Sequence, residues 1–386
     1  MRQMTKVPAI LIALGMSVGA AAAATPRVEY VVPAATQPQA AAKTTIWYDD
    51  FDGPEKTYTE TSGGVDKTVG LGGTGGSMLC LYKKGEQGIG NRKVFFGDSP
   101  TGKVVRKGEK FDEIYWRIYV KHQEGWTSGG ETGGPDKMSR ATSMASTNWN
   151  QAMISHVWSV ADTLTLDPAS GVRDGKVVTI KYNDFDNLHW LGQKPWAKFP
   201  IHATAEAGWW VCVEARAKLN TPGKKDGVNQ LWIDGKLEAE RTGLDWRGTY
   251  TEHGINAVFL EAYWNKTSPV EQRRWYDNFV IATEAIGPVV CGKNPIVKKT
   301  AFRGTGKQAD WGLEIAGDAG GEKVVWRSGS LGTAEQTAVD TKTGKFEGEL
   351  AGKTELAAGK VYWCRVREKG AEWSEWSLWH QGFRAE

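Results

Sequence analysis

Between Trp209 and Thr283, apolar and polar residues alternate with a period of two over several short runs. In the first run, the apolar residues are Val211, Val213, Ala215, Ala217 and Leu219, and the residues between them are Cys212, Glu214, Arg216 and Lys218. Successive side chains of a β-strand point to opposite faces, so this period places all the apolar residues on one face. The segment therefore predicts a strand with one packed face and one face toward solvent or ligand.

Similar runs recur along most of the chain, separated by turn residues. In 111–121, the apolar residues Ile114, Trp116, Ile118 and Val120 alternate in the same way. Further strands are predicted within 45–53, 76–85, 150–159, 176–183, 229–236, 255–264 and 273–283. The Gly-, Ser- and Thr-rich segment 127–143 is predicted to be a loop, and no long amphipathic helix is expected. Many short strands with turns between them predict an all-β sandwich or barrel.

The N-terminal residues have the pattern of a secretory signal peptide, predicted over 1–24. Arg2 and Lys6 precede the apolar stretch 7–19, and a zone of small residues follows. Such a stretch is short for a membrane-spanning helix. Residues 25–43 are rich in Ala, Pro, Gln and Thr, a composition typical of a disordered linker. We therefore expect a secreted or periplasmic protein without a membrane span.

The bulk composition restricts the possible partners. The 386 residues have a formal net charge of +3, so the chain lacks the strong positive charge that nucleic-acid binding favours. Nucleic acid is therefore not expected as a partner. Tryptophan is frequent, with 19 residues. Two interpretations remain open, because indole rings pack in the cores of β-sandwiches and also offer flat faces to sugar rings.

The chain contains four cysteines, Cys80, Cys212, Cys291 and Cys364. An oxidising compartment permits disulfides, and four cysteines allow three pairings. One possibility is a disulfide between Cys291 and Cys364 within the C-terminal part. Buried free thiols are the alternative for Cys80 and Cys212.

A second, smaller domain is predicted over 296–386. Arg365 and Arg367 alternate on a predicted strand, and Trp373 and Trp376 follow in the sequence WSEWS. Planar guanidinium groups stack well on indole rings, so a ladder of arginines and tryptophans is predicted. The strand YWCRVR and the WSEWS sequence resemble a fibronectin type III module, which implies a small β-sandwich.

Several segments of 44–289 resemble the concanavalin A-like jelly-roll superfamily, which includes polysaccharide lyases. The resemblance depends on DDFDG, FDEIYWRIYVK, LNTPGKKDGVNQLWIDG and WYDNFVIAT, and it implies a two-sheet jelly-roll sandwich. More narrowly, RIYVK followed by a Gly-rich loop and GGPDKM resembles polysaccharide lyase family 14. In that family a functional lysine follows a Gly-Gly pair, and Lys137 is the matching position. Here Pro135 and Asp136 intervene, and Met-Ser-Arg replaces Leu-Pro-Gly.

Alternation also groups polar and aromatic side chains that are candidates for a binding site. The pairs that share a strand face are Arg117 with Tyr119, His156 with Trp158, and Glu214 with Arg216. Tyr263 ends another predicted strand, and Arg140 follows Lys137 closely. If these faces belong to one concave sheet, they form a groove for a polysaccharide.

Cleavage of a uronic-acid polymer by β-elimination requires side chains of these types. A cation must neutralise the substrate carboxylate, a base must remove the C5 proton, and an acid must protonate the leaving oxygen. The catalytic candidates are Lys137, Arg117 or Arg140 as the cation, His156 or Tyr119 as the base, and Tyr263 or Tyr119 as the acid. The candidates for contacts to the sugar are Arg140, Trp158, Glu214, Arg216 and Tyr263.

Different functions remain open at this point. The chain is either a lyase acting on an acidic polysaccharide, a lectin-like or cell-surface module without catalysis, or a scaffold. Glycoside hydrolysis needs a pair of carboxylates, and the Glu-x-Asp-x-x-Glu strand motif is absent from the sequence. No cofactor is expected. A structural calcium ion remains possible at Asp49, Asp50 and Asp52, with Asp277, although such residues more often cap turns.

Overall fold

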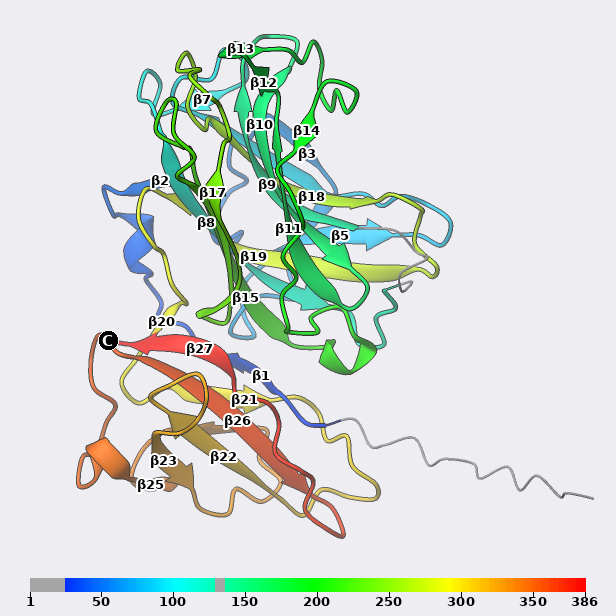
Figure 1. Cartoon of the computed structure of the whole chain (residues 1–386). Coiled ribbons are helices and arrows are strands. Elements are labelled where there is room, and N and C mark those ends of the chain that lie inside the picture. Colours follow the sequence, from blue (N-terminus) through cyan, green and yellow to red (C-terminus); the bar gives the residue numbers. More distant parts are fainter. Residues whose placement is uncertain (1–24, 129–135) are drawn as a thin grey trace, which may run out of the picture.

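The computed structural model describes residues 25–128 and 136–386 (Figure 1). The predicted signal peptide and residues 129–135 of the predicted loop lie outside the described residues. The prediction of an all-β protein with a jelly-roll sandwich is confirmed. The helices among the described residues are short 3-10 turns, Pro38–Ala40 (η1), Thr204–Glu206 (η3) and Gly348–Leu350 (η4). No helix in this part of the chain has the length and apolar character needed to cross a membrane.

The larger sandwich, shown at the top of Figure 1, contains two eight-stranded sheets. One of them is called the groove sheet below, and its strand order is β14-β11-β10-β9-β18-β6-β3, with β7 beside β6. Its strands are β3 (Glu60–Ser62), β6 (Asn91–Phe96), β7 (Val104–Val105), β9 (Asp136–Met144), β10 (Gln151–Val160), β11 (Thr163–Ser170), β14 (His189–Trp190) and β18 (Ala257–Trp264). The strands β12 (Val172–Arg173) and β13 (Lys176–Val177) form a separate hairpin.

The second sheet is called the back sheet, and its order is β17-β16-β15-β8-β19-β5-β4, with β2 beside β19. Its strands are β2 (Thr45–Asp49), β4 (Gly64–Asp66), β5 (Ser77–Tyr82), β8 (Glu113–His122), β15 (Trp210–Lys218), β16 (Gly227–Ile233), β17 (Lys236–Leu244) and β19 (Gln272–Ala282).

The alternation in β8 and β15 builds the core between the two sheets. The strands pair antiparallel, with Val213 opposite Ile118 and Ala215 opposite Trp116. All four side chains are buried in one apolar cluster with residues of the groove sheet. Burial of a large aliphatic side chain contributes roughly 1.5–3 kcal/mol. The predicted packed faces of these two strands are therefore confirmed.

Two segments of the larger sandwich differ from the prediction. The predicted loop 127–143 contains β9, whose polar side chains are buried against neighbouring strands and polar partners. The predicted strand 176–183 is regular only in β13, which pairs with β12 in the separate hairpin and not with the groove sheet. Polar residues in a buried strand resemble a loop in sequence because the usual apolar alternation is missing.

The smaller sandwich lies below the larger one in Figure 1. A six-stranded sheet has the order β20-β27-β26-β22-β23-β25, and a three-stranded sheet has the order β1-β21-β24. The strands are β1 (Val28–Val31), β20 (Val290–Cys291), β21 (Ile296–Lys299), β22 (Asp310–Ala316), β23 (Val324–Ser328), β24 (Gln336–Ala338), β25 (Gly344–Phe346), β26 (Val361–Lys369) and β27 (His380–Ala385).

The prediction that 25–43 is disordered is wrong for β1. This N-terminal strand pairs antiparallel with β21, and its Val28 is fully buried. The preceding Arg27 forms a buried ion pair with Glu206 of the larger sandwich. Three apolar residues within β1 supply enough surface to pack, although the flanking composition is that of a linker.

The four cysteines are free and buried. Cys291 lies in β20 and Cys364 in β26, and β27 separates these two strands. Two interstrand spacings amount to about 9–10 Å, beyond the Cα separation of about 7 Å that a disulfide tolerates. The disulfide considered between these two residues is therefore not formed.

The predicted ladder of arginines and tryptophans is confirmed on β26 and the segment before β27. The Arg365 guanidinium lies 4.7 Å from the Trp376 ring centroid and 4.6 Å from that of Trp379. Arg367 lies 4.4 Å from the Trp373 ring and 4.6 Å from the Trp376 ring. The rings and guanidinium groups thus alternate along one stack.

The smaller sandwich covers part of the outer face of the back sheet. Tyr119, Trp210 and Cys212 of the back sheet belong to the same apolar cluster as Trp311 and Phe383 of the smaller sandwich. The outer face of the back sheet is thus partly covered, and the outer face of the groove sheet is the one where we expect polar side chains that can contact a ligand.

Candidate functional site

Three predicted site residues lie on the back sheet and hold the chain that connects the two sandwiches. Arg117 Nη1 donates a hydrogen bond to the Gly287 carbonyl (2.8 Å). The Tyr119 hydroxyl accepts one from the Val289 N–H (2.9 Å), and the Glu214 carboxylate accepts one from the Gly287 N–H (2.8 Å). All three side chains are buried. Arg117, Tyr119 and Glu214 therefore do not lie with Lys137 and have a structural role here.

Arg216 also lies on the back sheet. Its guanidinium forms an ion pair with Glu113 of β8 (2.7 Å) and donates to Gln230 of β16 (2.7 Å). The prediction that it contributes to a common groove with Lys137 is wrong as well. Alternation identifies the residues that share a strand face, but it does not identify the sheet to which that strand belongs.

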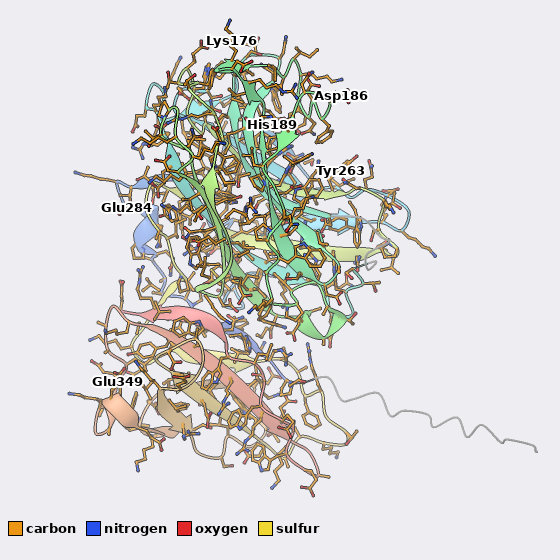
Figure 2. The ribbon with its side chains drawn as sticks, in the orientation of Figure 1. Lys176, Asp186, His189, Tyr263, Glu284 and Glu349 are labelled. Atoms are coloured by element: carbon orange, nitrogen blue, oxygen red, sulfur yellow. The ribbon has the colours of Figure 1, made fainter. Side chains whose placement is uncertain are left out.

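The other five predicted residues come together on the groove sheet. They are Lys137 and Arg140 of β9, His156 and Trp158 of β10, and Tyr263 of β18. Trp158 and Tyr263 both lie opposite Lys137 in the strand register, and His156 lies opposite Arg140. Tyr263 lies at the outer surface of the larger sandwich (Figure 2) and is 38% exposed.

A β-bulge in β9 determines where Lys137 points. The register of β9 shifts against both β10 and β18 in this region. Met138 is buried in the core between the sheets, and the Ser139 hydroxyl accepts a hydrogen bond from Trp116 Nε1 of the back sheet (3.0 Å). Two consecutive residues thus face the core, so Lys137 before them and Arg140 after them both lie on the outer face of the groove sheet. Bulges of this kind redirect side chains next to functional sites.

Lys137, Trp158 and Tyr263 line a groove with a volume of about 430 Å³, whereas Arg140 and His156 are fully buried and do not line it. Its lining includes Lys93, Lys137, Trp158, Tyr182, Glu261 and Tyr263. It has both cationic and aromatic walls, a composition suited to an anionic ligand with apolar ring faces.

Lys137 lies between two aromatic rings of the groove. Its Nζ is 4.5 Å from the Tyr263 ring centroid and 5.7 Å from the Trp158 ring centroid. The residue is only 7% exposed, and burial lowers the pKa of its ammonium group. Within 25–128 and 136–386, no carboxylate lies within 4.0 Å of its Nζ. Its ammonium group thus lies against two aromatic rings, with the charge of Glu261 acting from a greater distance, and it lacks a direct carboxylate partner among the described residues.

Arg140 lies at the centre of a buried polar network. It donates to Glu261 Oε1 and to Asn183 Oδ1, each at 2.8 Å. Its Nη1 also lies 3.3 Å from His156 Nε2. A guanidinium group can only donate, so His156 Nε2 is the acceptor and Nδ1 holds the ring proton.

His156 is consequently a poor candidate for a general base. It is fully buried, and burial followed by the charge of Arg140 lowers its pKa well below the ordinary value. The imidazole is therefore neutral, and its accepting nitrogen is already occupied by Arg140. Its Nδ1 has no hydrogen-bond partner among the residues described by the structure.

Two further charged residues of the groove are absent from the sequence-based candidates. Glu261 pairs with Arg140, and its place in β18, two residues from Tyr263, was the available signal. Lys93 of β6 pairs with Glu60 (2.7 Å) and lies over the rings of Trp149, Tyr182 and Phe259. Nothing in the local sequence of β6 distinguishes Lys93 from a solvated lysine.

The acidic residues considered for calcium have other partners. Asp49 accepts hydrogen bonds from the Tyr58 hydroxyl (2.6 Å) and the Phe51 N–H (2.9 Å), and Asp277 accepts one from the Leu71 N–H (2.7 Å). Three or more metal-binding side chains do not cluster anywhere in the described residues. A calcium ion at Asp49, Asp50 and Asp52 stays a prediction.

Comparison with known proteins gives matches among solved structures alone, since no family model and no curated protein matches the chain. An endo-β-1,4-glucuronan lyase from the fungus Trichoderma reesei is 15% identical, covers 62% of this chain and 96% of its own, and has a TM-score of 0.42. A PL-14 alginate lyase from Aplysia kurodai has the same identity, coverage of this chain and TM-score, with 100% of its own chain covered.

An alginate lyase from Chlorella virus is 13% identical, with a TM-score of 0.39, and the match covers 58% of this chain and 92% of that one. Solved structures similar to this chain thus include polysaccharide lyases. These likenesses are distant, so the function is inferred from the residues of the groove.

Proposed function

We propose that the groove binds an acidic polysaccharide and cleaves it by β-elimination at a uronic-acid residue. The observation on which this depends is the environment of Lys137, a largely buried cation beside Tyr263 that lacks a carboxylate partner among the described residues. A buried charge without a counter-charge is costly. Lys93, Arg140 and Lys194 all have carboxylate partners. A substrate carboxylate would supply the charge that Lys137 lacks.

The reaction follows from the positions of Lys137 and Tyr263 on neighbouring strands. The ammonium group of Lys137 binds the uronate carboxylate and makes the C5 proton more acidic. The deprotonated oxygen of Tyr263 takes this proton, the electron pair forms the C4=C5 double bond, and the C4–O bond to the next sugar breaks. The departing oxygen then takes the proton from Tyr263, which returns to its starting state. One chain gains a hydroxyl end and the other an unsaturated uronate end.

Arg140 is a positioning residue in this proposal. Its guanidinium holds Glu261, Asn183 and His156 in one network behind Lys137. His156 accepts from Arg140 and fixes that guanidinium, while Trp158 forms an aromatic wall. These assignments replace His156 as the base and leave Tyr263 as the residue that moves the proton.

The remaining parts of the chain complete the proposal. A secreted or periplasmic location, inferred from the N-terminal sequence pattern, would give the groove access to extracellular polymers. The smaller sandwich is proposed to be a fibronectin type III-like module. Its two-sheet architecture and the stack of Arg365, Arg367 and their tryptophans support this.

The test is a survey of polymers with the purified protein. Alginate, glucuronan, pectate, glycosaminoglycans and a neutral glucan are incubated separately, and ultraviolet absorbance reports the conjugated C4=C5 double bond. We expect absorbance to rise with at least one uronate polymer and not with the neutral glucan. If no polymer gives a rise but one slows the protein in an affinity gel, the elimination proposal is wrong and the chain is a binding module.

A further inference from the structure

The groove sheet continues past the groove toward an exposed aromatic surface. Tyr263, Lys137, Trp158 and Thr165 lie opposite one another on β18, β9, β10 and β11. The row ends at Trp196, which forms a bridge with Thr165. Residues opposite each other in antiparallel strands have side chains on the same face. Trp196 therefore lies on the face that contains the groove, three interstrand spacings or roughly 14 Å from Lys137.

Trp190 joins Trp196 on this edge. It lies opposite Ala169 on β11, and its ring stacks on that of Phe185, with centroids 6.5 Å apart and planes inclined by 20°. Trp190 is 42% exposed and Trp196 is 52% exposed. Phe185 also lines the groove. Phe185, Trp190 and Trp196 are called the aromatic shelf below.

A lysine links the aromatic shelf to the groove. Lys194 Nζ lies 5.6 Å from the Trp190 ring centroid and 5.9 Å from the ring centroid of Trp158, which lines the groove. The Lys194 ammonium pairs with Asp167 (2.7 Å), whose side chain is buried, while almost half of Lys194 itself is exposed. The Lys194 ammonium group thus lies between the groove and the aromatic shelf, where the indole rings are exposed.

We propose that the aromatic shelf is a second subsite for the uronate chain. One sugar of the chain binds Lys137 through its carboxylate, and a further sugar of the same chain binds the shelf. This deepens the proposed function and rests on it. The C–H face of a pyranose ring packs on an indole face. The half-exposed Lys194 ammonium pairs with Asp167 and has further N–H donors for a polar group of the sugar. The distance of roughly 14 Å spans more than one linked pyranose. The shelf therefore favours long substrates over short ones.

The experiment compares uronate oligosaccharides of increasing length with the wild-type protein, Trp196→Ala and Trp190→Ala. For the wild type, KM falls with length until the chain reaches the shelf. Each variant raises KM for the long oligosaccharides about 3- to 10-fold and leaves both kcat and the KM of the shortest cleaved substrate unchanged. Leu237→Ala, at an exposed apolar residue of the back sheet, is the control and changes neither value.

Two outcomes distinguish a failure of the shelf proposal from a failure of the lyase proposal on which it rests. If the wild type cleaves these substrates but the variants raise KM equally at all lengths or not at all, the shelf proposal is wrong and the lyase proposal stands. If the wild type cleaves none, the lyase proposal is wrong, and dissociation constants from calorimetry take the place of KM. In that case a loss of the length dependence in Trp196→Ala supports the shelf, and unchanged dissociation constants contradict it.

Discussion

At the residue scale, the properties of Lys137 depend on the side chains around it more than on its neighbours in the sequence. It lies between the rings of Trp158 and Tyr263, with Arg140 behind it in the same strand. Aromatic faces replace only part of the stabilisation that an ammonium group loses when water is excluded. The groove is thus arranged for a ligand that brings its own negative charge.

Replacement of Lys137 separates its charge from its proton chemistry. We expect Lys137→Met to lower kcat/KM by about 10²- to 10³-fold, because the developing charge on the substrate loses its cation. Lys137→Arg should retain part of the activity, since a guanidinium remains charged and still binds a carboxylate. Lys176→Met, at an exposed lysine at the top of Figure 2, is the matched control. Activity lost equally in Lys137→Arg and Lys137→Met would show that Lys137 acts as the base.

The lowered pKa of Lys137 predicts how binding depends on pH. Burial depresses this pKa below the ordinary lysine value of 10.5, and only the protonated form binds a carboxylate. Affinity for the polymer should therefore be full below the depressed pKa and decline as the pH rises through it. Affinity electrophoresis over a pH series measures this decline. In Lys137→Arg the decline should disappear, and a decline that persists unchanged would assign it to another group.

At the element scale, apolar alternation predicted the strands that form the core and failed where a strand is polar. The alternating runs in β8 and β15 were sufficient to predict these strands, because their apolar faces pack between the two sheets. The strand β11 was not predicted, since its sequence contains Asp167 and Pro168. Pro168 has no N–H group and so removes one donor from the hydrogen-bond ladder of the sheet. Its carbonyl still accepts a hydrogen bond from the Leu191 N–H (2.9 Å).

The site was predictable in part for the same reason. The pairing of His156 with Trp158 needed only the period of two within β10, and it is confirmed. The placement of Lys137 beside Arg140 needed the bulge at Met138, which local sequence does not reveal. The separation of Arg117 from the groove depends on strand order, which alternation does not encode.

The ladder on β26 is an element whose contribution to stability can be measured. Trp376 lies between Arg365 and Arg367, so its removal eliminates two cation–π contacts of about 0.5–1 kcal/mol each. Trp376→Ala should lower the free energy of unfolding by about 1–3 kcal/mol when lost packing is included. Chemical denaturation measures this loss, and Trp376→Phe should recover part of it. Unchanged stability in Trp376→Ala would mean that the stack is incidental.

At the scale of the whole molecule, the two sandwiches are joined by buried polar contacts as well as by apolar packing. Asp234, in the turn between β16 and β17, accepts hydrogen bonds from the N–H groups of Cys212 (2.9 Å) and Gln381 (3.1 Å). The first belongs to β15 and the second to β27, so one carboxyl group connects both sandwiches. Burial raises the pKa of Asp234 to about 7.

This shift predicts a pH dependence of stability. The folded state keeps Asp234 protonated up to a pH of about 7, whereas the unfolded chain releases the proton near 3.8. Between these values the folded state binds more protons, so the contribution of Asp234 to stability falls as the pH rises. Asp234→Asn removes this contribution, so the difference in unfolding free energy between variant and wild type should change across that window. A constant difference would contradict the assignment.

The proposed function requires the groove to recognise the carboxylate of a uronate polymer and to catalyse elimination across its C4–C5 bond. The most direct measurement compares one polymer with its carboxyl-reduced counterpart, using nuclear magnetic resonance to detect unsaturated ends after incubation with the wild type and with Lys137→Met. We predict unsaturated ends from the polymer with the wild type and almost none in the other three samples. Equal yields from the polymer with both proteins, or no unsaturated ends from any uronate polymer, would contradict the proposed function.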